Sequence, residues 1–308
     1  MKTVVTGGAG FIGSHLVNEL IALGFEVHAI DDLSSGDASR VHAGAVLHTA
    51  DIRGAEARET IKSVKPDVIF HLAAQADVQR SILQPGFDTD VNVLGTLNVL
   101  EAARDADVRK IVFASTSGVY GNLQKELLTE NDPTVPISFY GLSKLAAEHY
   151  IRLYNQFHGL AYTVLRYGNV YGPGQTVKGE GGVVAVFLDQ IEKGLSLFVN
   201  GDGEQTRDFI YVKDVVQANL AAAERGDGET IHIGTGSGTS VNRLAAILQS
   251  LHGRLVRVLH RPRKAGDILH SRLANAKARG LLLWKPHYDI EQGLRETYLA
   301  RFGRDDRR

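Results

Sequence analysis

A glycine-rich turn near the N-terminus places the strongest constraint on the fold. Residues 7–13 read Gly-Gly-Ala-Gly-Phe-Ile-Gly and directly follow the apolar run of residues 3–6. A strand that enters such a turn and continues as a helix leaves several backbone N–H groups pointing at one spot, where the helix dipole favours an anion. We expect Gly7 to take the positive φ of the turn, Gly10 to let phosphates approach, and Gly13 to let the helix pack on the strand. The turn therefore predicts a site for a dinucleotide pyrophosphate; a glycine turn without a ligand is the alternative.

The next predicted strand, residues 26–30, ends in a pair of acidic residues. These are Asp31 and Asp32, and Asp31 lies 24 positions beyond Gly7. A carboxylate at this place accepts hydrogen bonds from an adenosine ribose and repels a 2′-phosphate. No Arg or Lys occurs between Glu26 and Asp37. The sequence therefore favours NAD over NADP.

Composition excludes several classes of function. The chain has 308 residues, of which 44% are hydrophobic, a net charge of −1 and no cysteine. This length suits a full α/β domain with a smaller lobe, and the near-neutral charge gives no case for nucleic acid or an anionic membrane. Without cysteine, disulfides and thiol chemistry are excluded. No apolar run reaches membrane-spanning length, no signal-peptide core is present and no histidine pair has metal-ligand spacing, so we expect a cytoplasmic protein without a metal.

The first half of the chain alternates between apolar strands and helices. The strand candidates are residues 3–6, 27–30, 46–49, 67–71, 110–114 and 162–166, and the clearest helical patterns are residues 14–23, 89–106 and 140–157. Such buried runs separated by helices indicate a parallel sheet covered on both faces. After Asn169 the sequence becomes rich in turn-forming residues, and a helix is expected over residues 183–193. We therefore expect a large domain from residues 1–169 and 208–233, and a smaller lobe from residues 170–207 and 234–308.

The spacing of a tyrosine and a lysine predicts a site for proton transfer. Tyr140 and Lys144 are four residues apart at the start of the helix of residues 140–157, so they lie one turn apart on one face. A free tyrosine has a pKa near ~10, and an ammonium together with an oxidised nicotinamide favours the phenolate. Thr116 follows a predicted strand at the edge where such sheets bind ligands, so we expect it to hold a substrate hydroxyl. The alternative for the tyrosine and lysine is an ordinary exposed pair on a helix.

These residues form part of a longer set of motifs by which the chain resembles the extended short-chain dehydrogenase/reductases, and most of all their UDP-glucose 4-epimerase branch. The motifs are residues 6–15, Asp31-Asp-Leu-Ser-Ser-Gly36, Asp51-Ile52, His71-Leu-Ala-Ala-Gln75, Asn92-Val-Leu-Gly-Thr96, Thr116, Tyr140 with Lys144, residues 166–173, Gly201-Asp-Gly203, Arg207-Asp208-Phe209 and Gly266-Asp267. The resemblance implies an α/β, doubly wound parallel-sheet Rossmann fold with a smaller α/β substrate lobe interleaved in sequence. It also implies interconversion of UDP-glucose and UDP-galactose through a 4-keto sugar.

The resemblance assigns site residues position by position. Thr116, Tyr140 and Lys144 match the catalytic positions. The positions that match NAD contacts are Gly7, Gly10, Phe11, Ile12, Gly13, Asp31, Asp32, Ser35, Gly36, Asp51, Ile52, Leu72, Ala73, Ala74, Asn92, Ser115, Tyr140, Lys144 and Tyr167. Those that match the UDP-sugar site are Thr116, Tyr140, Asn169, Gly182, Val183, Asn200, Arg207, Arg263, Lys264, Asp267 and Ser271.

Some positions depart from the family pattern. The family usually has arginine where this chain has Lys264, so either Arg263 or Lys264 is expected to meet the pyrophosphate. Asn200 stands where an aromatic ring often stacks on uracil, and Gly168 stands where a phenylalanine often precedes Asn169. Ser271 matches a position that controls the space around C2 of the sugar, so UDP-N-acetylglucosamine is expected to be accepted too.

Rival functions share much of this pattern. Related dehydratases carry an Asp-Glu pair after the catalytic hydroxyl and related decarboxylases a Glu, whereas here Ser117 and Gly118 follow Thr116. A UDP-glucuronate 4-epimerase remains an alternative, and so does a binding protein that senses NAD without turnover. The resemblance further implies a homodimer in which the helices of residues 89–106 and 140–157 form a four-helix interface, with Leu94, Leu97, Leu100, Ala146 and Ala147 offering apolar surface.

Overall fold

A seven-stranded parallel sheet forms the centre of the molecule. The computed structural model describes residues 1–123, 125–177, 181–262 and 270–303. The strand order is β11-β6-β5-β4-β1-β2-β3, and every neighbouring pair is parallel. The strands are β1 (Lys2–Thr6), β2 (Glu26–Asp31), β3 (Val46–Thr49), β4 (Val68–His71), β5 (Lys110–Thr116), β6 (Ala161–Tyr167) and β11 (Glu229–Ile233). The order reverses between β1 and β4, and ligands of such sheets bind outside the carboxyl ends of the strands at this point.

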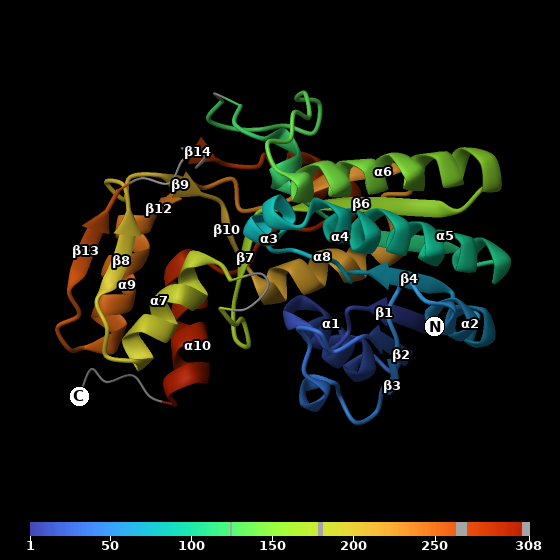
Figure 1. The fold of residues 1–308 in the computed structure, drawn as a ribbon, viewed down its shortest axis with the longest axis horizontal. Helices are drawn as coiled ribbons and strands as arrows, with labels where there is room; N and C mark the ends of the chain where they lie inside the picture. The colour runs from blue at the N-terminus through green and yellow to red at the C-terminus, as the bar shows by residue number, and fades with distance from the viewer. Residues whose placement is uncertain (124, 178–180, 263–269, 304–308) are drawn as a thin grey trace.

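Helices cover both faces of the sheet, which confirms the doubly wound α/β fold. On one face lie α1 (Phe11–Ala22) and α8 (Val212–Glu224), and on the other α2 (Ala55–Val64), α5 (Gly95–Asp105) and α6 (Phe139–His158) (Figure 1). Each layer has its own apolar core: Leu16 and Val215 belong to the first, Ile61 and Ile151 to the second, and all four are fully buried. This two-sided burial explains the near-continuous Val and Ile runs of the strands.

The helix expected over residues 89–106 is interrupted. After α3 (Val78–Leu83), α4 covers Pro85–Thr89, a single π-helical turn covers Asp90–Leu94 and α5 begins at Gly95. Such a turn carries one extra residue, often beside a functional site. Here it holds the buried Asn92 amide, whose Nδ2 donates to Gln75 O at 2.9 Å and to Ser143 Oγ at 3.1 Å. Apolar periodicity gives no signal for this turn.

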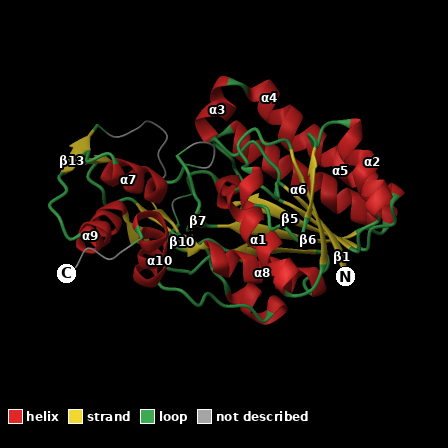
Figure 2. Cartoon of the chain, turned by 90° about the horizontal axis from the view of Figure 1, so that it is seen from below, coloured by secondary structure: helices red, strands yellow, loops and turns green. Residues whose placement is uncertain are grey.

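A smaller lobe lies at one end of the sheet. It contains α7 (Val183–Glu192), β8 (Leu197–Asn200), β9 (Thr206–Arg207), β12 (Thr239–Ser240), α9 (Val241–His252), β13 (Val258–Arg261), β14 (His270–Ser271) and α10 (Ile290–Phe302). Both views place α7, α9 and α10 together, far from α2 and α5 (Figures 1 and 2). The pair β7 (Asn169–Tyr171) and β10 (Phe209–Tyr211) lies between this lobe and the sheet, and the chain then returns to the sheet through α8 and β11. Within the described ranges, no helix is long and apolar enough to cross a membrane.

Candidate active site

A cavity of about 350 Å³ opens at the carboxyl ends of the central strands. It lies where the order of the sheet reverses, the place expected for a ligand. The cofactor residues expected from the sequence that line this cavity are Gly7, Gly10, Phe11, Ile12, Gly13, Asp31, Asp32, Ser35, Asp51, Ile52, Leu72, Ala73, Ala74, Ser115, Tyr140, Lys144 and Tyr167. The structure therefore brings together residues that are up to 160 positions apart, from Gly7 to Tyr167.

The glycine turn has the geometry that a pyrophosphate needs. Gly7 adopts a φ of +71°, and a β-carbon there would lie 2.8 Å from Ala73 N. A β-carbon on Gly13 would collide with the carbonyl of Gly7. The two glycines therefore let the turn pack closely against the segment after β4 and against its own backbone, and α1 begins directly behind the turn at Phe11. A glycine turn at a helix N-terminus fits the phosphates of a dinucleotide.

Asp31 connects the turn to the second strand. Its Oδ2 accepts a hydrogen bond from Ala9 N at 2.9 Å and its Oδ1 one from Leu33 N at 2.9 Å. Burial raises the pKa of this carboxyl, and the backbone N–H donors oppose that rise. The carboxylate thus orders the glycine turn and also lines the cavity, where it could accept hydrogen bonds from ribose hydroxyls.

Two expected cofactor residues do not line the cavity. Gly36 lies behind Asp31, where a β-carbon would come within 2.7 Å of Oδ1. Asn92 is buried, and its Oδ1 accepts a hydrogen bond from Gln75 N at 2.9 Å. Gly36 and Asn92 therefore lie behind two residues that line the cavity, Asp31 and Gln75.

Tyr140 and Lys144 lie on the cavity wall at the start of α6. The helix begins after Ser138, whose Oγ accepts a hydrogen bond from Gly141 N at 3.1 Å. Lys144 is 2% exposed, and its Nζ lies 4.1 Å from the centre of the Phe113 ring. A cation that is removed from water acts strongly on nearby groups, because little solvent screens it. Both residues of the pair therefore line one cavity, and their role as a lysine-assisted tyrosine base stays a prediction.

Thr116 lies next to the start of α6 although it does not line the cavity. It is the last residue of β5, and its Oγ1 accepts a hydrogen bond from Gly118 N at 3.0 Å. A β-carbon on Gly141 would lie 2.6 Å from Gly118 O, so the segment after Thr116 packs directly against the residue that follows Tyr140. The role of Thr116 as the residue that holds a substrate hydroxyl stays a prediction.

His71 is a buried residue near Lys144 that sequence reasoning gave no role of its own. Its Nδ1 lies 2.7 Å from Thr6 Oγ1 and its Nε2 lies 2.9 Å from Thr96 Oγ1. Since Thr96 Oγ1 donates to Asn92 O at 2.7 Å, His71 Nε2 must carry the proton, and Thr6 donates to Nδ1. Burial lowers the pKa of His71 to about 3, and the Lys144 ammonium adds to the shift. The neutral ring ties β1, β4 and α5 together below the cavity.

Because its pKa is lowered, His71 should make the stability of the fold depend on pH. Its folded pKa of about 3 lies below the unfolded value of 6.5, so the unfolded chain binds more protons between these pH values. This contribution is fully present above pH ~6.5 and is lost as the pH falls toward ~3. Urea unfolding at pH 7 and pH 5 should show about 2 kcal/mol more acid destabilisation for the unaltered chain than for His71→Gln. Parallel pH dependences of the two chains would contradict the assignment.

A second group of expected residues gathers around Asp208, beside the pair β7 and β10 that lies between the sheet and the small lobe. Ser271 in β14 lies beside Arg207 in β9, and Asn169 N donates to Asp208 O at 2.7 Å. The buried Asp208 carboxylate accepts hydrogen bonds from Thr235 N, Thr235 Oγ1, Gly236 N and Leu273 N. Burial raises the pKa of Asp208, and these donors oppose the rise. Asp208 therefore fixes the backbone around Arg207 and Ser271.

The remaining residues that were expected to bind substrate lie at the ends of helices and strands or outside the described part of the chain. Gly182 precedes α7 and Val183 is its first residue, while Asn200 is the last residue of β8. Arg263, Lys264 and Asp267 fall outside the described residues. Whether Arg263 or Lys264 meets the pyrophosphate therefore stays a prediction.

Comparison with known proteins decides the family. Residues 3–234 match the model of the NAD dependent epimerase/dehydratase family. The chain belongs to this family. A putative UDP-glucose 4-epimerase of Methanocaldococcus jannaschii is 44% identical over 96% of both chains. The solved UDP-glucose 4-epimerase of Thermotoga maritima, with UDP-glucose, is 42% identical, with a TM-score of 0.95 over 99% of this chain and 100% of that one. The Thermus thermophilus UDP-glucose 4-epimerase, in complex with NAD, is 38% identical, with a TM-score of 0.93 over the same shares.

Membership of this family confirms the prediction of an NAD-dependent enzyme, and the cavity fits that cofactor. The cavity is also lined by residues that the sequence did not identify, namely Ile30, Ser34, Arg40, Ala50, Gln75, Ala76, Asp77, Arg80, Phe87, Val91, Ala114, Gln175 and Thr176. Gln75 could have been predicted, because it belongs to the motif His71-Leu-Ala-Ala-Gln75. No motif pointed to Arg40, because its position depends on a distant contact: its Nη1 donates to Gly174 O at 2.8 Å, 134 positions along the chain. Across residues 1–123, 125–177, 181–262 and 270–303, no cluster of three His, Cys, Asp or Glu side chains could hold a metal.

Proposed function

We propose that this chain is a UDP-glucose 4-epimerase, which interconverts UDP-glucose and UDP-galactose with NAD in the cavity. The observation that carries the proposal is that Tyr140 and Lys144 line the same cavity as the glycine turn. A proton-transfer pair and a dinucleotide site in one space suit the oxidation of a sugar hydroxyl. The full-length similarity to UDP-glucose 4-epimerases supports this reaction class.

The residues of this chain have separate tasks in the proposed reaction. Bound NAD⁺ supplies a hydride acceptor for C4 of the sugar, and return of the hydride to the other face inverts C4. Tyr140 Oη takes the proton of the 4-hydroxyl and later gives it back, while the Lys144 ammonium favours the phenolate. Thr116 holds a sugar hydroxyl beside Tyr140. Arg207 and Asn169 retain the UDP moiety, so the sugar can turn over between the lobes without being released.

The sequence after Thr116 favours epimerisation over elimination. Ser117 and Gly118 follow, and the backbone N–H of Gly118 donates to Thr116 Oγ1. A dehydratase or decarboxylase needs a carboxyl group at this point as an acid or base for the second step. With no such group, return of the hydride is the simplest fate of the 4-keto sugar.

A chromatographic assay tests the proposed function. Purified protein with NAD⁺ is incubated separately with UDP-galactose, UDP-N-acetylglucosamine and UDP-glucuronate, and the products are separated. We expect UDP-glucose from UDP-galactose, and also conversion of UDP-N-acetylglucosamine. Conversion of UDP-glucuronate alone would favour the uronate epimerase, and NAD binding without any conversion would favour a sensor protein. We also propose a cytoplasmic location, because nucleotide sugars and NAD both occur there.

The helices α5 and α6 support a further part of the proposal, a homodimer through a four-helix interface. Leu94 of the π-helical turn is 53% exposed, but Leu100 and Ala147 are fully buried in the core and cannot contribute. Leu97 and Ala146 are half-buried. The exposed apolar side chains on α6 instead follow helical spacing, at Leu142, Tyr150, Leu153 and Phe157. This apolar stripe on α6, together with Leu94, suits packing against a second copy.

Leu153→Glu should dissociate this dimer. A carboxylate in an apolar interface loses its hydration without a partner, so the dimer dissociation constant should rise about 100-fold or more. Sedimentation velocity at micromolar concentration measures the change. Leu259→Glu is a matched control, because Leu259 is 45% exposed against 46% for Leu153 but lies on β13 in the small lobe. A monomeric unaltered chain, or equal effects of both variants, would contradict the interface.

A further inference from the structure

A line of buried polar side chains begins at the cavity wall and passes through the helix that carries Tyr140. Ser115, which lines the cavity, donates from Oγ to Glu148 Oε1 at 2.6 Å. Glu148 lies one turn beyond Lys144 on α6 and has no exposed surface. Arg166 on β6 donates two hydrogen bonds to the Glu148 carboxylate, from Nε to Oε1 at 2.9 Å and from Nη2 to Oε2 at 2.6 Å. This fork fixes α6 against the sheet in the turn that follows Lys144.

The line continues through Tyr120 and His232 into the small lobe. Arg166 Nη1 donates to Tyr120 Oη at 2.6 Å, Tyr120 Oη lies 2.5 Å from His232 Nε2, and His232 Nδ1 lies 3.2 Å from Ala274 O. A guanidinium can only donate hydrogen bonds, so the Tyr120 hydroxyl accepts one from Arg166 and donates one to His232 Nε2. His232 must then carry its proton on Nδ1 and donate it to Ala274 O. The three hydrogen bonds between Arg166 Nη1 and Ala274 O therefore all donate in the direction of the small lobe.

Burial keeps the two central groups neutral, as this order of donors requires. It raises the pKa of Tyr120 to about 12, and it lowers the pKa of His232 to about 4. Both side chains are fully buried, and their rings meet edge to face with centroids 5.4 Å apart. Tyr120 Oη lies between Arg166 Nη1 and His232 Nε2, so the removal of this hydroxyl takes a hydrogen-bond partner from a buried group on each side.

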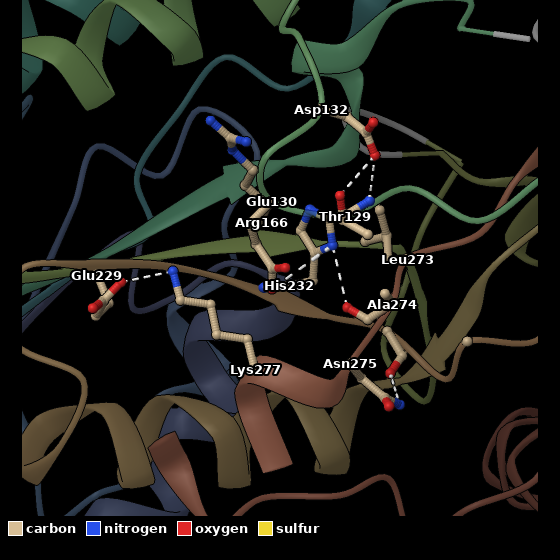
Figure 3. A network of polar contacts seen from close by, with 12 residues as sticks. Thr129, Glu130, Asp132, Arg166, Glu229, His232, Leu273, Ala274, Asn275 and Lys277 are labelled. Carbon is tan, nitrogen blue, oxygen red and sulfur yellow. Dashed lines mark hydrogen bonds and ion pairs between the residues drawn. The ribbon is translucent and has the colours of Figure 1, made fainter. Parts of the chain in front are cut away.

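The far end of the line lies in the segment that carries Ser271. Figure 3 shows His232 between Ala274 and Glu130, with Arg166 close by. Leu273 N donates to the Asp208 carboxylate at 3.1 Å, and Ala274 N donates to Leu128 O at 2.8 Å. The segment of residues 271–274 is therefore held on one side by Asp208 and on the other by His232.

We propose that Tyr120 and His232 are positioning residues that hold residues 271–274 of the small lobe at a fixed distance from α6, and so set the space in which the sugar turns. The inference rests on the proposed UDP-sugar epimerase activity. Neither side chain lines the cavity, so both would act through Ser271 on one side and through Arg166, Glu148 and the Tyr140 helix on the other. Loss of the link should loosen the 271–274 segment and weaken the fit of the sugar more than the proton transfer.

Tyr120→Phe tests the link, with Tyr298→Phe as a matched control. Tyr298 is also buried, and its hydroxyl lies 2.9 Å from a histidine ring nitrogen, His252 Nδ1, but it packs α10 against α9. For Tyr120→Phe we expect KM for UDP-galactose to rise about threefold to tenfold, the effect of one hydrogen bond of ordinary strength. The ratio of kcat/KM for UDP-N-acetylglucosamine to that for UDP-galactose should also change, while kcat falls less than KM rises. Tyr298→Phe should change neither.

A pair of variants at His232 separates hydrogen bonding from packing. His232→Leu fills a similar volume without a donor, whereas His232→Asn is smaller but can still donate to Ala274 O. If the link acts through its hydrogen bonds, Asn should keep KM closer to the unaltered value than Leu does. If packing alone matters, Leu should be the milder change, and the proposal fails.

Amide hydrogen exchange tests the link independently of activity. The protected amides of Leu273 and Ala274 should exchange about threefold to tenfold faster in Tyr120→Phe than in Tyr298→Phe. If the unaltered chain converts no UDP-sugar but this difference appears, the proposed function fails and the structural link stands. If the chain is an active epimerase and Tyr120→Phe equals Tyr298→Phe in exchange, KM and sugar preference, the link is overturned.

Discussion

Tyr140→Phe should lower kcat for UDP-galactose by about a thousandfold, while the affinity for UDP stays close to that of the unaltered chain. General acid–base catalysis by a positioned side chain contributes about 10²- to 10⁴-fold, and this change removes only the hydroxyl. Tyr140 lines the cofactor cavity, whereas the residues expected to hold UDP lie in β7, β9 and the start of α7. Steady-state kinetics measure the loss, and calorimetric titration with UDP measures the affinity.

A tyrosine on the same helix provides the control. Tyr154 lies in α6 but packs against the apolar core and does not line the cavity. Tyr154→Phe should therefore leave kcat within about twofold of the unaltered chain, since the loss of an exposed or half-buried hydroxyl has a small effect. Near-normal turnover in Tyr140→Phe would remove this residue from the acid–base role.

Ser271→Tyr should lower the activity toward UDP-N-acetylglucosamine much more than the activity toward UDP-galactose. Ser271 is 7% exposed and lies in β14 beside Arg207 of β9, where one partner strand and Asp208 fix the backbone. A tyrosine ring there would fill space that an N-acetyl group at C2 needs, and exclusion from a tight pocket is worth about 1–3 kcal/mol or more. We expect kcat/KM for UDP-N-acetylglucosamine to fall about 10- to 100-fold, with UDP-galactose turnover reduced much less.

Ser271→Ala separates size from polarity at this position. Alanine is as small as serine, so both sugars should remain substrates if space decides the preference. Competition between UDP-galactose and UDP-N-acetylglucosamine in one reaction gives the ratio of kcat/KM directly. Unchanged N-acetylhexosamine turnover in Ser271→Tyr would show that Ser271 does not control the space around C2.

Much of the fold could be predicted from the sequence because its signals are local. The apolar runs, the glycine turn and the acid at Asp31 are each short patterns with a direct structural meaning, and the seven-stranded sheet confirms the strands that the apolar runs predict. Tyr140 and Lys144 were identifiable because a single helical turn brings them together. The sequence comparisons confirm the family that these motifs indicated.

The features that could not be predicted depend on contacts between distant segments. The π-helical turn of residues 90–94 is set by hydrogen bonds from Asn92 to Gln75 and Ser143, which hydrophobic periodicity does not encode. Tyr120 and His232 meet although they lie 112 positions apart. The roles assigned to Arg207, Asn169 and Ser271 stay predictions, because they depend on where a bound sugar nucleotide would lie.

The hydrogen at C4 of the sugar gives the most direct test of the proposed reaction. UDP-galactose carrying deuterium at C4 is incubated with the protein and NAD⁺ in ordinary water, and the UDP-glucose formed is analysed by mass spectrometry and by proton NMR. An epimerase that returns the same hydride should give UDP-glucose with deuterium retained at C4 and no net NADH. Loss of the label to solvent, steady accumulation of NADH, or the absence of UDP-glucose would contradict the proposed reaction.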